Sequence, residues 1–523
     1  MTQINGIINT NTNFLINKKE EKKVNEEVSK DISQSESSVK VPQGTVLASL
    51  GVVQSPSFGK KEKIEFPKSS EFEYVENLPF SKELTTMDKI NLSKVLEKKD
   101  EQTGYMQQLI DLACEGKVTP FATKSLCSHG KMNDFVVKDL KTYNHAKKNN
   151  IPLEEAFCPT FASQKEANKN VEVGDVFKVE GEDNIYVKYN GKESEQLKMD
   201  RETYMELFPP ISRFSSSQGH TGDCYLLSSI NSMMENPRTR SALYECFTQK
   251  GNDIEVQLPN GKATAVCPNK KLPETADLQK YTTGPMGMKM LEHIYGKELD
   301  AVYNEQYDTL VQDEIAGMKE ELADLKENQP QNDATLKKQQ SLEKKIGNWE
   351  AGRAKVEEAR KNHDDGMVFV IDEYGDFVIG KNGPITKSAE KLDSSYKNAP
   401  DYYRGANGGT LDEAMVHFGF ANVQYYTVID DEVKLDKALN AANPDKYIIT
   451  ASTYSSEDGG MEQAQETEYS IYSSHAYKIL PYDSEDGERR FKVTNPWNQS
   501  HMVDMDMDKL KEYFEDFAVS KVG

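Results

Sequence analysis

The sequence predicts an α+β fold, in which helical segments precede and interrupt a core that contains short strands. Apolar residues recur at helical spacing within residues 81–150 and again within residues 303–365. Apolar and polar residues alternate from 177 to 189, which is typical of strands in a small meander. A second strand pair is predicted at 475–493, because a tight-turn signal at residues 486–487 separates two apolar runs.

Changes in composition divide the chain of 523 residues into six regions. The first is rich in Ser, Asn, Lys and Glu and poor in aromatic residues, so we expect it to be disordered. A helical region and a small β meander with a linker follow, and two prolines then mark the boundary where a core begins. The core is expected as two segments that a charged helical insertion separates. In chain order the regions span residues 1–70, 71–170, 171–210, 211–302, 303–365 and 366–523, the insertion being the fifth.

The insertion has the pattern of an antiparallel, coiled-coil-like helical hairpin. Apolar residues step by four and three positions from Val311 to Leu325 and again from Leu342 to Val356, with a break at 328–330. Glu and Lys fill the other faces. Such an arm is a candidate surface for a protein partner, and a solvated insertion without a partner explains the pattern equally well.

Composition also limits the partners and the compartment. The net charge of −22, from 64 basic and 86 acidic residues, argues against nucleic acid or an anionic membrane as the main partner. No run of 18 apolar residues is present, so we expect no membrane span, and residues 1–30 lack the apolar segment of a Sec signal peptide. The six cysteines have no spacing typical of disulfides or zinc sites. We therefore expect a reducing compartment, either the cytoplasm or one reached by a non-classical export route.

The stretch Gln-Gly-His-Thr-Gly-Asp-Cys-Tyr-Leu-Leu at 218–227 has the features of a site that carries a nucleophile. Its glycines permit a tight turn and apolar residues at helical spacing follow, which places Cys224 at the first turn of a buried helix. Unpaired N–H groups and the helix dipole favour the thiolate there. Gln218 can fold back and donate a side-chain N–H to an oxygen that becomes negative during attack. A structural cysteine entering a core helix would show the same local pattern, so a catalytic role requires a partner base.

His475 and Asn495 are the predicted partners of Cys224. His475 begins the first strand of the predicted hairpin and Asn495 ends the second, so the tight turn between them would bring the two side chains together. The imidazole would accept the thiol proton, and the Asn carbonyl would hold the ring in one tautomer and direction. Taken singly, His475 is more often a satisfied surface or core residue, and Asn495 before proline is an ordinary turn former.

These segments, in this order, resemble the catalytic core of the calpain family of papain-like cysteine proteases. The stretch at 218–227 resembles the family's active-site motif, Ser-His-Ala-Tyr at 474–477 resembles Gly-His-Ala-Tyr, and Thr-Asn-Pro-Trp at 494–497 resembles Arg-Asn-Pro-Trp. The resemblance covers about 211–300 and 366–523, and further matching segments lie at 288–297, 408–415 and 510–514. Three positions depart from the family pattern and bear on the shape of the cleft: Tyr225 replaces Trp, Ser474 replaces Gly, and Asn498 replaces Gly.

The resemblance implies a papain-like core of two subdomains and a mechanism. Cys224 would attack the scissile carbonyl after giving its proton to His475, Asn495 would orient His475, and Gln218 with the backbone N–H of Cys224 would form the oxyanion hole. Residues implied to lie along the substrate cleft are Trp497, Gly222, Gly408 and Gly409.

Calcium aligns the two subdomains in typical calpains, so calcium is the candidate cofactor and no covalent cofactor is expected. Glu457 and Asp458 lie in an acidic loop and are candidate ligands, because calcium prefers several hard oxygens. A solvated acidic loop is the alternative, and the sequence contains no EF-hand loop. The predicted function is a calpain-like cysteine endopeptidase that cleaves protein substrates. The alternatives are a catalytically weak or inactive calpain-like interaction or scaffold protein, and an acyl-transfer enzyme with an amine as acceptor.

Overall fold

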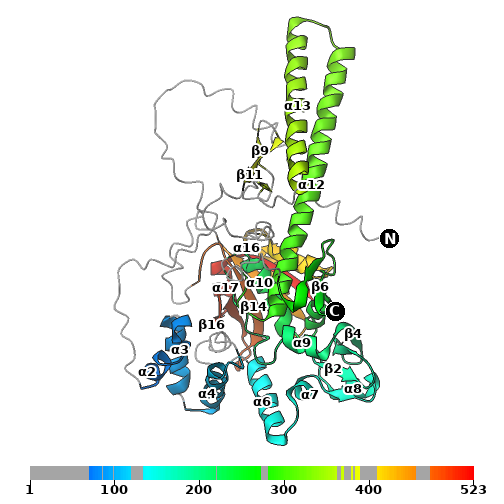
Figure 1. The fold of residues 1–523 in the computed structure, drawn as a ribbon. Helices are drawn as coiled ribbons and strands as arrows, with labels where there is room; N and C mark the ends of the chain where they lie inside the picture. Colours follow the sequence, from blue (N-terminus) through cyan, green and yellow to red (C-terminus); the bar gives the residue numbers. More distant parts are fainter. Residues whose placement is uncertain are drawn as a thin grey trace. The chain divides into compact units, whose positions relative to one another are not determined.

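The computed structural model describes most of the chain beyond residue 69 (Figure 1). All described residues belong to the second of two compact units, which spans Val52–Gly523. The described residues contain both helices and sheets, with main sheets of seven and six strands, which is consistent with the predicted α+β class. The predicted disorder of residues 1–70 concerns positions that, except for Ser70, lie outside the described residues. The structure describes residues 70–84, 86–97, 99–118, 134–219, 221–272, 281–361, 367–369, 378–380, 383–388, 409–454 and 471–522.

Short helices form the first part of the described chain. The helix α4 begins with a capping box, in which the Asp100 side chain accepts from the Thr103 backbone N–H and the Thr103 side chain accepts from the Asp100 N–H. Val136, Leu140 and Tyr143 form the buried face of α6. These elements are α2 (Ser70–Glu76), the 3-10 helix η2 (Ser81–Glu83), α3 (Thr86–Glu97), α4 (Glu101–Cys114), α6 (Asp134–Asn149), α7 (Leu153–Phe157) and α8 (Gln164–Asn170).

A buried ion pair joins α6 to the segment that leads toward Gln218. Asp139 on α6 accepts two hydrogen bonds from the Arg213 guanidinium, at 2.7 and 3.1 Å, and a third from the backbone N–H of Ile211 at 2.9 Å. The two side chains are only 3% and 8% exposed. Because a buried charge must be paired and hydrogen-bonded, α6 fixes the position of the chain at residues 211–213.

The first sheet has seven strands in sequential order, β1 to β7. The predicted meander forms its first half, but the sheet continues through a parallel contact between β4 and β5, at Lys198 and Thr248, into strands of the next region. The meander is therefore not an isolated unit. The strands are β1 (Thr160–Phe161), β2 (Val176–Val179), β3 (Asn184–Lys188), β4 (Ser194–Asp200), β5 (Phe247–Lys250), β6 (Asp253–Val256) and β7 (Ala265–Cys267).

The second sheet has six antiparallel strands in the order β12-β17-β13-β14-β15-β16. The strands β14 and β15 form the hairpin predicted around residues 486–487, with Lys478 opposite Thr494. Its elements are β12 (Val423–Thr427), β13 (Tyr447–Thr453), β14 (Ala476–Asp483), β15 (Arg489–Asn495), β16 (Asn498–Met505) and β17 (Phe514–Lys521), with helices α15 (Leu411–His417), α16 (Val428–Ala441) and α17 (Met507–Tyr513). Two small strand pairs precede them: β8 (Met367–Phe369) with β11 (Thr386–Ser388), and β9 (Ile379–Gly380) with β10 (Gly383–Pro384).

The helix α10 (Cys224–Glu235) lies between the two halves of the core and packs on β13 and β14. Leu226 and Ile230 of α10 share one apolar cluster with Ala476 and Ala518 of the second sheet. This helix therefore brings residues of the 211–302 segment against those of the 366–523 segment. Neighbouring elements are α9 (Arg201–Leu207), α11 (Arg240–Glu245) and the 3-10 helix η3 (Pro268–Lys270).

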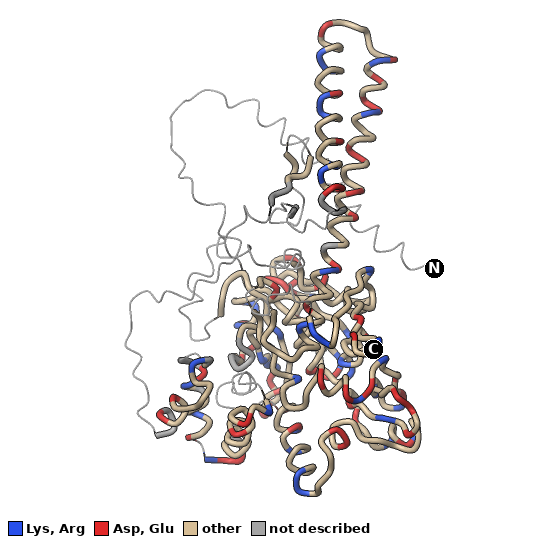
Figure 2. The backbone as a smooth tube through the Cα atoms, viewed as in Figure 1, with Lys and Arg blue, Asp and Glu red and all other residues tan. Residues whose placement is uncertain are grey.

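Two long helices, α12 (Met286–Glu327) and α13 (Asp333–Lys361), form a helical hairpin (Figure 1). An apolar seam that includes Val311 and Trp349 joins them, and residues of both charges recur along both helices (Figure 2). The first helix, α12, does not begin at the predicted start of the insertion. It runs unbroken from Met286, and its first turns are buried in the core. None of the helices within the described ranges combines the length and apolar content that a membrane span requires.

Candidate active site

Cys224 is the first residue of α10 and follows a turn formed by Thr221, Gly222 and Asp223. Gly222 is exposed, Asp223 is buried, and Cys224 is half-buried. The Asp223 side chain makes no capping hydrogen bond to the helix. The early backbone N–H groups of α10 therefore remain directed at the region around the thiol.

The second sheet meets the thiol at the start of β14. The Cys224 Sγ accepts a hydrogen bond of 3.4 Å from the backbone N–H of Ala476, which lies 252 residues further along the chain. Ala476 directly follows His475, so the packing of α10 on β14 brings the thiol to the residue next to the imidazole.

His475 and Asn495 are in contact, as the hairpin pattern predicts. The His475 Nε2 lies 2.9 Å from the Asn495 Oδ1, and the backbone N–H of Trp497 donates to the same oxygen at 2.8 Å. Two donors converging on Oδ1 orient the amide with its carbonyl toward the ring. Nε2 then carries the ring proton, which leaves Nδ1 as the acceptor for a further proton.

Aromatic side chains surround the His475 ring. The Trp497 ring centroid lies 4.1 Å from it and the Tyr477 centroid 5.0 Å from it, while Tyr472 packs on Trp497 at 4.8 Å. Tyr472 and Tyr477 were not among the predicted site residues. Tyr477 follows His475 by two positions in a strand and so shares its face, whereas Tyr472 has no comparable sequence signal.

Gln218 also lies at this junction. Its backbone N–H donates to the Pro496 carbonyl at 2.8 Å, and its side-chain Nε2 donates to the Thr221 carbonyl. The same amide also faces the Asp223 carboxyl, so the oxyanion role predicted for Gln218 requires the amide to exchange one of these acceptors for the oxyanion. Contacts within one small region thus connect all four residues predicted to act in catalysis: Cys224, His475, Asn495 and Gln218.

The structure describes three of the four residues predicted to lie along a cleft. Trp497 covers His475, and Gly222 is exposed close to Cys224 in the chain. Gly409 lies against the ring of Tyr225, where an added Cβ would come within 2.5 Å of a ring carbon. Close packing against Tyr225 therefore explains this glycine. Gly408 lies outside the described residues.

Burial shifts the pKa values of the Cys224 thiol and the His475 imidazole. It raises the pKa of the Cys224 thiol to about 11, although the Ala476 N–H opposes this shift, and it lowers the pKa of His475 to about 4 against the effect of the Asn495 hydrogen bond. Burial of Cys224 therefore opposes the thiolate that the helix N-terminus was expected to favour. Desolvation by the packed side chains outweighs the helix dipole, so burial favours a neutral thiol and a neutral imidazole here.

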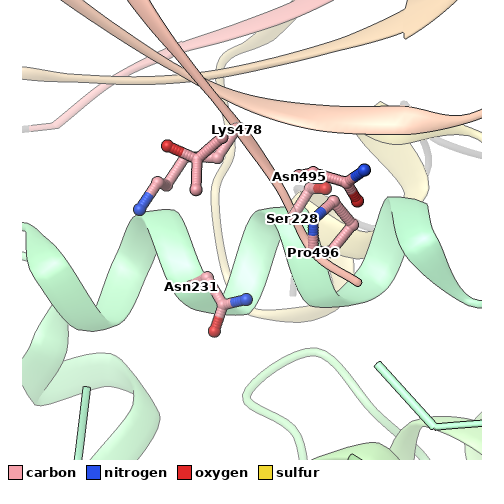
Figure 3. Close-up of a pocket in the computed structure, with 6 residues that line it drawn as sticks. Ser228, Asn231, Lys478, Asn495 and Pro496 are labelled. Carbon is pink, nitrogen blue, oxygen red and sulfur yellow. The ribbon is translucent and has the colours of Figure 1, made fainter. Parts of the chain in front are cut away.

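Behind the site, polar side chains fill the contact between α10 and the second sheet (Figure 3). Lys478 reaches from β14 to Glu235 at the end of α10, with Nζ and Oε1 2.7 Å apart and the side chains 6% and 11% exposed. The hydroxyls of Ser228 and Thr494 are buried there without a hydrogen-bond partner among the described residues. One buried ion pair therefore accompanies the apolar contacts that hold the two halves of the site together.

Calcium ligands predicted at Glu457 and Asp458 lie outside the described residues. Among the residues that the structure describes, no cluster of three or more His, Cys, Asp or Glu side chains could hold a metal ion. All five described cysteines, including Cys224, are free, and Cys158, Cys246 and Cys267 are buried.

No protein-family model matches the chain, and no curated protein matches its sequence. A function for this chain is therefore inferred from its motifs and from the geometry of the site that they form.

Proposed function

We propose that this protein is a calpain-like cysteine endopeptidase with a papain-like core of two subdomains. One observation carries the proposal: the Cys224 thiol, on a helix from one half of the core, meets the start of the strand that follows His475, whose ring is held by Asn495. A nucleophile, a base and an orienting group are the three roles that acyl transfer by a thiol requires.

The proposed reaction proceeds through an acyl-enzyme. The Cys224 Sγ attacks the scissile carbonyl carbon while its proton passes to the His475 Nδ1, and the side chain of Gln218 with the backbone N–H of Cys224 stabilises the oxyanion. His475 then returns the proton to the leaving amine, and a thioester remains on Cys224. Water, deprotonated by His475, attacks the thioester, releases the carboxylic acid and restores the thiol. Asn495 contributes by holding the ring direction through both steps.

Calcium control of the closed arrangement and a protein partner for the helical hairpin remain predictions. The runner-up function is a catalytically weak or inactive calpain-like scaffold, and one observation favours it. The thiol and imidazole are both held in their neutral forms by burial, which is a poor starting point for nucleophilic attack unless substrate binding or opening of the cleft changes their surroundings.

Labelling with an electrophilic thiol probe, followed by mapping of the labelled cysteine, tests the proposal together with cleavage of an unstructured protein. We expect Cys224 to be labelled and cleavage to be abolished by Cys224→Ala and by His475→Ala. The matched control is Cys114→Ala, which removes an exposed cysteine on another helix and should leave cleavage unchanged. Cleavage by the Cys224→Ala variant at the wild-type rate would disprove the assignment. Labelling without cleavage would favour the scaffold function.

A further inference from the structure

Two carboxyl groups are buried in contact with each other beside the nucleophile. Asp223, directly before Cys224, is fully buried, and Glu292, in the second turn of α12, is 1% exposed. The two side chains are within hydrogen-bonding reach of each other, and the Gln218 amide faces the same Asp223 carboxyl. Both oxygens of Asp223 and the Oε1 of Glu292 are buried, and none of them accepts a hydrogen bond of normal geometry from another described residue, so two ionised carboxylates would be poorly compensated there.

A shared proton resolves this conflict. Burying an ionised carboxylate costs several kcal/mol, and two adjacent ones also repel, so one carboxyl keeps its proton and donates to the other. Burial raises the pKa of Asp223 to about 7, and burial together with the Asp223 charge raises the pKa of Glu292 well above its ordinary value. The other titratable groups that face the pair are Lys289 on α12, and Cys224 and Tyr225 on α10.

The second oxygen of Glu292 holds the opposite side of the same turn. Its Oε2 accepts from the backbone N–H of Thr282 at 2.7 Å. The Thr282 hydroxyl and the Thr283 N–H in turn donate to the carbonyl of Ser217, at 2.8 and 2.9 Å. Ser217 precedes Gln218. The Glu292 side chain is therefore connected to both ends of the stretch from Gln218 to Cys224: to one end through Thr282 and Ser217, and to the other through Asp223.

We propose that Glu292 is a positioning residue, which donates its proton in a hydrogen bond to Asp223 and so clamps the turn between Gln218 and Cys224 onto the base of α12. The effect on catalysis rests on the proposed function. The clamp itself does not, because it is a property of the folded chain.

The clamp has a pH signature whose sign differs from that of a salt-bridged carboxylate. In the unfolded chain Glu292 loses its proton near its ordinary pKa of about 4.3. In the folded chain the proton is retained to higher pH. The stabilisation is therefore fully present below the unfolded pKa and is lost as the pH rises through the raised folded value. A salt-bridged carboxylate would instead lose its stabilisation as the pH falls.

The first test measures the free energy of unfolding of the full chain against pH, in a Cys224→Ala background that prevents self-cleavage. Between about pH 5 and about pH 8, we expect the parent to lose stability more steeply than the Glu292→Gln variant, since Gln keeps a donor and an acceptor but has no proton to lose. The matched control is Glu298→Gln on the same helix. Glu298 is equally buried, and its carboxylate accepts from the backbone N–H groups of Lys262 and Ala263. Equal pH slopes in the parent and the Glu292→Gln variant would overturn the proposal.

The second test measures labelling of Cys224 by a thiol probe. Glu292→Gln should label within about tenfold of the wild type, whereas Glu292→Ala should label about 10²-fold more slowly, as expected when a reacting group is displaced by about 1 Å. A Gln variant as slow as the Ala variant would overturn the proposal, because the amide preserves the donor. If Cys224 of the wild type is labelled but the protein does not cleave protein substrates, the endopeptidase function is refuted. Both tests of the clamp remain valid in that case, because neither measures cleavage.

Discussion

The ion pair between Lys478 and Glu235 should contribute strongly to the stability of the contact between α10 and the second sheet. Lys478 lies three residues after His475, and Glu235 ends the helix that Cys224 begins, so the pair connects this helix to the strand that follows His475. Lys478→Met removes one partner and leaves the Glu235 carboxylate buried at 11% exposure. Breaking a buried pair in this way costs about 3–5 kcal/mol. The total stability of a protein is only about 5–15 kcal/mol.

The helical hairpin offers a matched control. Lys326 and Glu343 lie at the same separation, 2.7 Å, but their side chains are 50% and 49% exposed. Water screens this pair, so Lys326→Met should cost less than about 1 kcal/mol. The double variant Lys478→Met/Glu235→Leu should recover most of the stability lost in Lys478→Met, since neither buried charge is then present.

The assay is urea unfolding followed by the fluorescence of Trp497, which packs on His475. A Cys224→Ala/Trp349→Phe background removes self-cleavage and the signal of the only other tryptophan, in the hairpin. In the Cys224 protein, Lys478→Met should also lower the cleavage rate. If Lys478→Met lowers the free energy of unfolding no more than Lys326→Met does, burial does not increase the cost of breaking the Lys478–Glu235 pair, and the reasoning is refuted.

Four further results are expected. Asn495→Ala should leave slow residual cleavage, because it removes only the orientation of His475; wild-type rates would show that another group holds the ring. Gln218→Ala should lower the cleavage rate about 10²–10³-fold, as for one oxyanion donor, and no loss would place the oxyanion hole elsewhere. The rate of Cys224 labelling in the free protein should rise about tenfold per pH unit between about pH 6 and about pH 9, since burial raises the pKa of the thiol to about 11; a plateau beginning at acidic pH would instead indicate a thiolate. Calcium should increase cleavage if it aligns the two halves, and equal rates in excess chelator would dismiss that dependence.

Short-range patterns predicted the parts of the site that short-range structure builds. The apolar run after Cys224 forms a helix that begins at that residue, and the strand-turn-strand pattern brings His475 to Asn495. Burial could not be predicted in the same way. The pKa shifts of Cys224 and His475 depend on side chains from distant parts of the chain, and so does the contact between Asp223 and Glu292.

Helix boundaries were predicted less well where composition changed without a change of periodicity. The charged insertion was expected to begin at residue 303, but α12 starts at Met286 and passes through that point without a break. Helical spacing is the same on both sides, and only the surroundings differ, from core to solvent. The pairing of β4 with β5 could likewise not be predicted, since a parallel contact between separate regions leaves no turn signal in the sequence.

The Asp139–Arg213 pair limits how this protein could mature by trimming of its N-terminus. A cut downstream of residue 139 that released α6 would leave the buried Arg213 guanidinium without its carboxylate partner, at a cost of about 3–5 kcal/mol. Trimming that preserves the stability of the fold would therefore have to occur before Asp134, where α6 begins. The helix would then remain part of the trimmed protein.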